Sequence, residues 1–120
     1  MNNTLYTERY GRLKELSRKL ILEIPEVMAG FGELHAMAVE PGALDTKSKE
    51  LIALGIAIAV HCDGCIGFHV HDALVAGATR REILEAIGVA ILMGGGPCMV
   101  YGCEAMDALD QFEKEQNPPL

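Results

Sequence analysis

Two cysteines, a histidine and a glutamate are spaced in this sequence as a redox-active thiol pair would require. Cys62 and Cys65 are separated by two residues, His69 follows four positions later, and Glu50 precedes Cys62 by twelve. A thiol with a pKa of about 8.5 is mostly protonated at neutral pH, so the nucleophilic thiolate needs a nearby base. A second cysteine can then resolve a sulfenic acid or mixed disulfide within the chain. The pattern predicts a catalytic dithiol whose protons are handled by His69 and Glu50.

These side chains can meet only if the chain turns between them. At about 100° and 1.5 Å per residue, Cys62, Cys65 and His69 share one stripe of a helix, but on a continuous helix Glu50 would lie about 18 Å from Cys62. Two antiparallel helices that turn at residues 59–60 bring Glu50 level with His69. The turn also places both cysteines at a helix N-terminus, where free N–H groups favour a thiolate. Cys65, one turn from His69, is the expected first nucleophile and Cys62 its partner.

Hydrophobic periodicity predicts helices along the whole chain. The predicted helices cover residues 5–23, 26–39, about 47–60, 62–76, a segment after Thr79, and 97 to about 114, followed by a tail at residues 117–119. Asp45 or Thr46 can cap the third helix, and Thr79 with Glu82 forms a capping box before the fifth. Residues 51–60 are apolar all round, so we expect a buried helix; a strand is the competing interpretation. No repeat or linker divides the chain, so residues 1–120 are expected to form a single domain.

The composition excludes several classes of function. The net charge of −7 and the lack of a basic cluster argue against nucleic acid. No apolar run reaches the roughly 18–20 residues that cross a bilayer, and residues 1–10 lack the apolar core of a secretory signal. We therefore expect a soluble cytoplasmic protein, in which a close cysteine pair is catalytic or metal-binding. Half of the residues are hydrophobic in a chain of 120, a surplus that predicts a homo-oligomer.

The complete spacing resembles a known motif. Glu50, eleven intervening residues, Cys62-x-x-Cys65, three residues and His69 are similar to the core motif of the alkylhydroperoxidase AhpD-like branch of the carboxymuconolactone decarboxylase family. The resemblance covers about residues 41–102, including residues 90–97. True lactone decarboxylases of the family look different, since they lack this cysteine pair. The longer two-repeat peroxidases have a histidine just before the second cysteine, where this chain has Gly64; His61 is a candidate to substitute for it in part.

The resemblance implies an all-α fold, a bundle of about six helices built around a central helical hairpin, that assembles as trimers or hexamers. It also implies peroxidase or disulfide-reductase activity through Cys62 and Cys65, with Glu50 and His69 as a proton relay. The expected substrate is a hydroperoxide or a disulfide. An external dithiol, either a reductant protein or a small molecule, would return the electrons, and no metal or bound cofactor is expected.

Two other functions compete with a redox pair. A zinc site could use both cysteines, His69 and a fourth ligand such as His61, Glu50 or a residue from another subunit, although one helix offers only three ligands on one stripe. A non-redox, decarboxylase-like enzyme could use Glu50 and His69 as acid and base in an apolar pocket. The cysteines could also be inert buried thiols.

The remaining polar and sulfur-containing residues are expected to be structural. Cys98 and Cys103 do not face each other on a helix and are expected to be buried. Residues 94–97 predict a tight turn between helices. His35 is expected to be a structural histidine, and His71 and Asp72 to form a solvated or interface face. The methionines are expected to fill the core or an interface.

Overall fold

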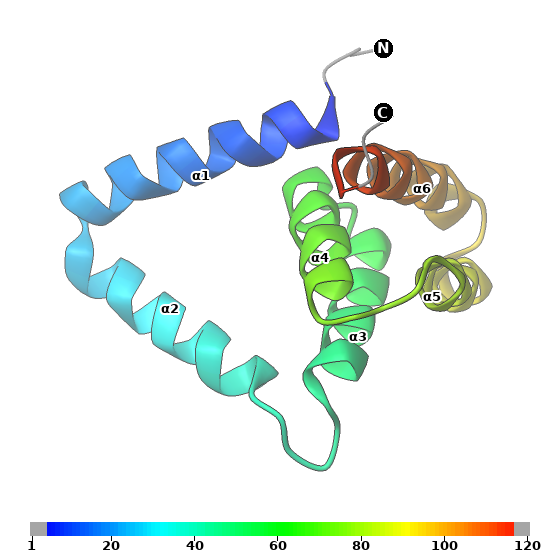
Figure 1. The fold of residues 1–120 in the computed structure, drawn as a ribbon, viewed down its shortest axis with the longest axis horizontal. Helices are drawn as coiled ribbons and strands as arrows, with labels where there is room; N and C mark the ends of the chain where they lie inside the picture. Colours follow the sequence, from blue (N-terminus) through cyan, green and yellow to red (C-terminus); the bar gives the residue numbers. More distant parts are fainter. Residues whose placement is uncertain (1–4, 117–120) are drawn as a thin grey trace.

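A computed structural model of the chain describes residues 5–116, which form six helices and no strand (Figure 1). The helices are α1 (Tyr6–Glu23), α2 (Pro25–Val39), α3 (Thr46–Ala59), α4 (Asp63–Val75), α5 (Arg80–Gly94) and α6 (Gly96–Gln116). The all-α fold predicted from the sequence is confirmed. The predicted tail at residues 117–119 lies outside the described residues. Across residues 5–116, none of the helices has the length and apolar character needed to span a membrane.

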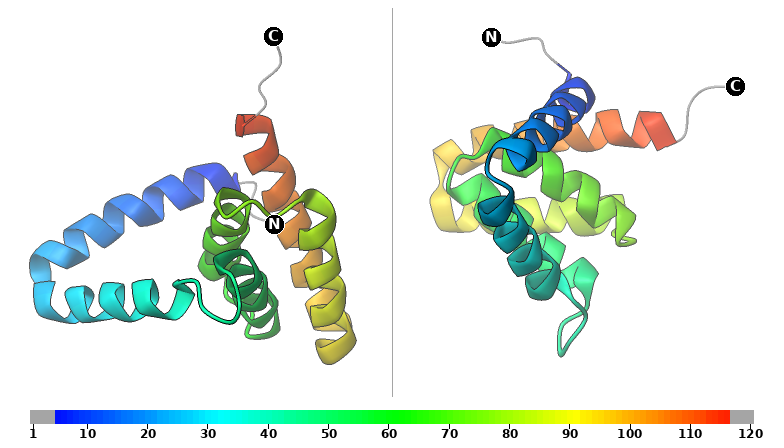
Figure 2. Two further views of the ribbon diagram at one scale, coloured as in Figure 1. Left: turned by 60° about the horizontal axis from the view of Figure 1, so that its bottom comes forward. Right: turned by 90° about the vertical axis from the view of Figure 1, so that its left-hand side faces the viewer.

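A central bundle carries an arm on one side (Figures 1 and 2). The hairpin of α3 and α4 lies at the centre of the bundle, with α5 against α3 and with α6 against α4 and α5. The first turns of α1 lie against α4 and α6, and the rest of α1 extends outward until the chain reverses at Ile24 and returns along α2. The central hairpin, which carries the predicted site, is therefore held by helices on several sides.

Five of the six helices contribute to one hydrophobic core. The core residues are Tyr6, Leu54, Ala57, Ile58, Ile66, Val70, Ala73, Ala78, Ile83, Ile87, Ala90, Cys98, Ala105, Ala108, Leu109 and Phe112. Small residues allow close approach in this core: a Cβ added at Gly102 would lie 2.8 Å from Ile87 Cγ2. Close packing of this kind between α5 and α6 resists local rearrangement.

Local capping chemistry sets the ends of several helices as the sequence predicts. Asp45 accepts a hydrogen bond of 2.7 Å from the Ser48 N–H at the start of α3. Thr79 and Glu82 form a reciprocal capping box at the start of α5, with bonds of 2.8 and 3.1 Å. Gly95, with φ of +69°, makes the tight turn predicted between α5 and α6.

The prediction that residues 51–60 are buried all round is wrong for a single chain. Leu54 and Ile58 are fully buried, but Ile52 and Ile56 are 51% and 57% exposed. The helix α3 carries apolar side chains on all its sides, but the rest of the chain packs against only one of those sides. On the other side lies an apolar groove of about 400 Å³ between α3 and α5, lined by Leu51, Ile52, Gly55, Ile56, Ala59, Ala86, Val89, Ala90 and Met93.

The arm also leaves apolar side chains uncovered. On α2 no residue is buried, and Val27, Phe31 and Leu34 are each more than 60% exposed. The methionines share this exposure, so core filling is the wrong interpretation for those at 37, 93, 99 and 106. Their alternative role, at an interface, stays a prediction.

Candidate active site

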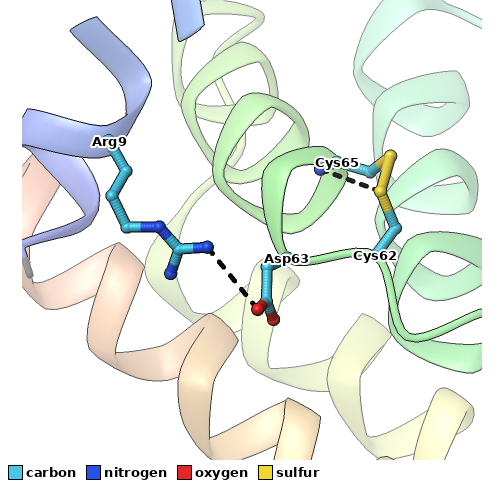
Figure 3. The surroundings of a disulfide bond; sticks show 4 residues. All are labelled: Arg9, Cys62, Asp63 and Cys65. Atoms are coloured by element: carbon cyan, nitrogen blue, oxygen red, sulfur yellow. Dashed lines mark hydrogen bonds and ion pairs between the residues drawn. A yellow bond between two sulfur atoms is a disulfide. The ribbon is translucent and has the colours of Figure 1, made fainter. Parts of the chain in front are cut away.

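Cys62 and Cys65 lie at the start of α4 and are joined by a disulfide (Figure 3). Cys62 is the N-cap of the helix, and its Sγ accepts a hydrogen bond of 3.3 Å from the Cys65 N–H. The two Cα atoms are 5.2 Å apart, within the usual range for disulfides of about 4.4–6.8 Å. Both residues are half-buried. The backbone thus holds the two sulfur atoms where each can react with the other.

The helical hairpin brings Glu50 to His69. Glu50 Oε2 on α3 lies 2.8 Å from His69 Nδ1 on α4. The Glu50 side chain is only 3% exposed, whereas the His69 side chain retains 22% of its exposure. The turn after Ala59 places the two residues level with each other, as the spacing predicts.

The contact with Glu50 determines which nitrogen of His69 carries a proton. When Nδ1–H donates to the Glu50 carboxylate, the neutral ring keeps a free lone pair on Nε2. His69 lies one helical turn after Cys65, a spacing that puts the two Cβ atoms about 5–6 Å apart. From there Nε2 can accept a proton from the Cys65 thiol, directly or through a water. The structure thus shows a buried carboxylate that holds an imidazole one helical turn from Cys65.

His61 shapes the turn that precedes the cysteines. Its backbone has φ of +60°, in the left-handed region, which is costly for a residue with a side chain. Its ring stacks on Tyr101 of α6, with centroids 4.5 Å apart and planes 2° from parallel. The stacking gives His61 a structural role in holding the turn against α6.

A second polar cluster, which no motif in the sequence indicates, adjoins the cysteine pair. Arg9 Nη2 of α1 lies 3.5 Å from Asp63 Oδ2 at the start of α4 (Figure 3). Burial raises the pKa of Glu104 on α6, the charge and hydrogen bonding of Asp63 raise it further, and Arg9 and Tyr6 oppose the shift. The pKa of the Tyr6 hydroxyl is raised as well, mainly by its burial and next by the negative charge of Glu104.

The two carboxyl groups of this cluster are suited to share a proton. Asp63 Oδ1 and Glu104 Oε2 are buried, and neither accepts a hydrogen bond within residues 5–116. Two ionised carboxylates can only accept, so a proton on one of them supplies the missing donor. The two residues are 41 positions apart in the sequence, and no motif or spacing predicts that they lie close together.

His35 and Asp72 lie close to Glu50, although the three residues come from three different helices. One ligand atom each of His35, Glu50 and Asp72 lies within 4.8 Å of the others. His71 contacts this group through Asp72, whose Oδ1 lies 3.0 Å from His71 Nδ1. The same Nδ1 is 3.1 Å from the hydroxyl of Tyr10 on α1, and the two rings stack. A fully solvated face is therefore the wrong interpretation for His71 and Asp72, since both are half-buried with defined neighbours, while their alternative place at an interface stays a prediction.

The other two cysteines are unpaired. Cys98 is buried, as predicted, with its Sγ in the space that a Cβ at Gly94 would need. Cys103 is exposed, so the prediction of burial is wrong for it. Its nearest polar contact is Met99, with 3.8 Å between the sulfur atoms. The outward position of Cys103 on α6 makes it a useful control for the reactive pair.

Known proteins are similar to this chain over the region that contains the candidate site. The model of the carboxymuconolactone decarboxylase family matches residues 25–108, which include Glu50, Cys62, Cys65 and His69. An uncharacterised protein of Cupriavidus necator is 36% identical over 107 residues, which are 87% of this chain and 95% of that protein.

Two solved structures share the arrangement of helices. A carboxymuconolactone decarboxylase family protein from Legionella pneumophila, in its apo form, is 43% identical with a TM-score of 0.88, over 91% of this chain and 97% of that one. A family protein from Thermotoga maritima, with a suggested involvement in antioxidative response, is 30% identical with a TM-score of 0.71. That likeness covers 76% of this chain and 94% of the Thermotoga chain.

Proposed function

The chain belongs to the carboxymuconolactone decarboxylase family, and we propose that it is an AhpD-like, thiol-dependent oxidoreductase that reduces hydroperoxides or disulfides. The observation that carries this proposal is the Cys62–Cys65 disulfide at the N-terminus of the helix that also bears His69. Glu50 holds the ring of that histidine. The suggested antioxidative role of the similar Thermotoga protein fits chemistry of this kind.

In the oxidative half-reaction the thiolate of Cys65 attacks the terminal oxygen of a hydroperoxide. The O–O bond breaks, an S–O bond forms, and Cys65 becomes a sulfenic acid. The departing alkoxide takes a proton and leaves as an alcohol. Cys62 then attacks the sulfenic sulfur, and the displaced hydroxide leaves with a proton as water. The two thiols thus give two electrons to the peroxide and end as the disulfide.

Proton transfer in this sequence is assigned to His69 and Glu50. Nε2 of His69 takes the proton of the Cys65 thiol and later gives it to the alkoxide. The buried carboxylate of Glu50 holds Nδ1 and stabilises the ring while it is charged, as the acid does in a nucleophile–histidine–carboxylate triad. The N-terminus of α4 assists by favouring negative charge on sulfur.

Reduction of the disulfide requires an external dithiol. Its thiolate attacks one sulfur and displaces the other, and its second thiol then releases the mixed disulfide. Cys62 Sγ accepts the Cys65 N–H and caps α4, so Cys62 is the better leaving thiolate. The attack is therefore assigned to the Cys65 sulfur. Two electrons from the donor restore both thiols.

A mass-resolved thiol titration tests the proposal. The reduced chain is treated with an alkyl hydroperoxide, and the expected product has lost two hydrogens from the peptide that contains Cys62 and Cys65. The double variant Cys62→Ser/Cys65→Ser should have no dithiol-driven peroxide turnover, while Cys103→Ser serves as the matched control and keeps it. Unchanged turnover in the double variant would contradict the proposal. Activity on a lactone or β-keto acid that survives both substitutions would instead support acid–base chemistry by Glu50 and His69.

The active form is proposed to be a homo-oligomer, a trimer or hexamer as the resemblance implies. Two apolar surfaces support this: the side of α2 with Phe31 and Leu34, and the groove between α3 and α5. Exposed apolar surface of this extent is commonly covered by another subunit. Light scattering should give a multiple of the chain mass, reduced by Phe31→Asp and unchanged by Glu33→Gln on the same helix. A wild-type mass of one chain would contradict the assembly.

A further inference from the structure

Three side chains from three helices converge at one point beside the proposed proton relay. His35 comes from α2, Glu50 from α3 and Asp72 from α4, and one nitrogen and two oxygen atoms of these residues lie within 4.8 Å of one another. They are a set of imidazole and carboxylate donors that zinc and similar ions use in proteins. The set cannot be recognised as a motif in the sequence, because His35 and Asp72 are 37 residues apart.

Each carboxylate of the set is held from behind by a histidine that is not one of the three. Glu50 Oε2 lies 2.8 Å from His69 Nδ1, and Asp72 Oδ1 lies 3.0 Å from His71 Nδ1. The His71 ring is positioned by stacking on Tyr10, with centroids 4.4 Å apart, and the hydroxyl of that tyrosine lies 3.1 Å from the same Nδ1. Hydrogen-bonded support of the ligating carboxylates is characteristic of metal sites.

Among residues 5–116, no lysine or arginine forms an ion pair with Glu50 or Asp72. Within the described part of the chain, the ion-pair partner of Glu50 is His69 and that of Asp72 is His71. The Glu50 side chain is 97% buried beside the half-buried Asp72, and burial of a carboxylate next to a second one is unfavourable unless a cation accompanies it. A bound divalent ion would provide the positive charge that balances the two carboxylates.

We propose that His35, Glu50 and Asp72 form a binding site for a divalent transition-metal ion, with Zn²⁺ as the ion of choice. Bond lengths of about 2.0–2.2 Å to nitrogen and oxygen put the ligands of a zinc ion about 3.4 Å apart. Exposed His35 and half-buried Asp72 reach that spacing from 4.8 Å by small side-chain rotations. Three protein ligands leave a fourth position for water.

Occupation of this site would control the dithiol chemistry, and this step rests on the proposed function. A zinc ion bound to Glu50 draws on the same carboxylate that holds Nδ1 of His69. The relay then loses the group that stabilises charged His69, and deprotonation of Cys65 slows. Zinc therefore acts as an inhibitor of the oxidoreductase that binds beside the sulfur pair without using it.

Metal binding is tested first, without reference to activity. The metal-free, oxidised chain carries Cys103→Ser, so that the reactive pair is a disulfide and the exposed thiol is absent. Calorimetric titration with Zn²⁺ should give one ion per chain, and His35→Ala or Asp72→Asn should each weaken binding at least about tenfold. Glu33→Gln, on the exposed side of α2, should not change it. Failure of the parent chain to bind zinc, or equal affinity in all variants, would overturn the site.

Cobalt identifies the ligand atoms, and turnover tests the regulatory step. Co²⁺ should show ligand-field bands without a sulfur-to-cobalt band; such a band would place the ion on thiols and overturn the site. Zinc should inhibit peroxide turnover of the wild type at concentrations that leave His35→Ala uninhibited. Binding with no inhibition of an active enzyme would overturn the regulatory step. An absence of turnover even without zinc, together with normal binding, would contradict the proposed function and leave the site standing.

Discussion

Nδ1 of His69 lies 2.8 Å from Oε2 of Glu50, although the two residues are 19 positions apart and belong to different helices. The carboxylate is almost completely buried, whereas the ring on the other side of the contact still reaches solvent. A buried acid behind a half-exposed base fixes the orientation of that base while it exchanges protons.

Glu50→Gln should reduce the peroxide turnover of the reduced enzyme by about 100-fold at neutral pH, because an amide keeps the shape but cannot stabilise a charged ring. The deficit should narrow at alkaline pH, where thiols ionise without a base. Stopped-flow measurement of thiol loss over a pH series gives both quantities. Glu85→Gln, on the exposed face of α5, is the control, and equal pH profiles for the two variants would exclude the relay.

The order of attack by the two cysteines can be read from trapped intermediates. In Cys62→Ser, the remaining Cys65 should be oxidised by peroxide to a sulfenic acid that a dimedone reagent captures, since the resolving thiol is absent. In Cys65→Ser, peroxide should label Cys62 much more slowly, because His69 lies one turn from position 65. Peptide mass mapping measures both adducts. Faster labelling of Cys62 would reverse the assignment.

The Asp63–Glu104 pair should make the stability of the fold depend on pH. The pKa of Glu104 is raised above its ordinary value of 4.5, first by burial and then by Asp63. The folded chain therefore holds a proton that the unfolded chain releases. The stabilisation is complete below pH 4.5 and is lost as the pH rises through the folded pKa. Glu104→Gln should flatten this decline in urea melts between pH 4 and 8, while Glu85→Gln should follow the wild type. A wild-type slope in Glu104→Gln would contradict the shared proton.

Removal of the cap of α5 should destabilise the bundle without disturbing the site. Thr79→Ala loses the side-chain oxygen that accepts the Glu82 N–H, a change that costs about 1 kcal/mol in comparable helices. Thermal unfolding should occur about 4 °C lower. Thr79→Ser restores the oxygen and should recover most of the loss; if it does not, the capping box is not the source.

The parts of the structure that follow from local sequence were predictable. The Thr79–Glu82 cap depends on residues three apart, and the Glu50–His69 contact depends only on where one hairpin turns. The clusters of His35 with Glu50 and Asp72, and of Asp63 with Glu104, depend on the angles between helices that the sequence does not encode locally. The exposure of Ile52 and Ile56 was missed for a similar reason, since hydrophobicity shows that a face needs a partner but not whether the same chain supplies it.

The N-cap position of Cys62 makes one sulfur atom serve two roles. As a cap it accepts the Cys65 N–H and helps to start α4; as a reactive group it gains or loses charge and a covalent partner. By thermodynamic linkage, whatever favours the thiolate at this position also favours the order of the helix that begins there, and the reverse holds equally. Each redox cycle should therefore tighten and relax the first turn of α4, a change that amide hydrogen exchange at that turn would report.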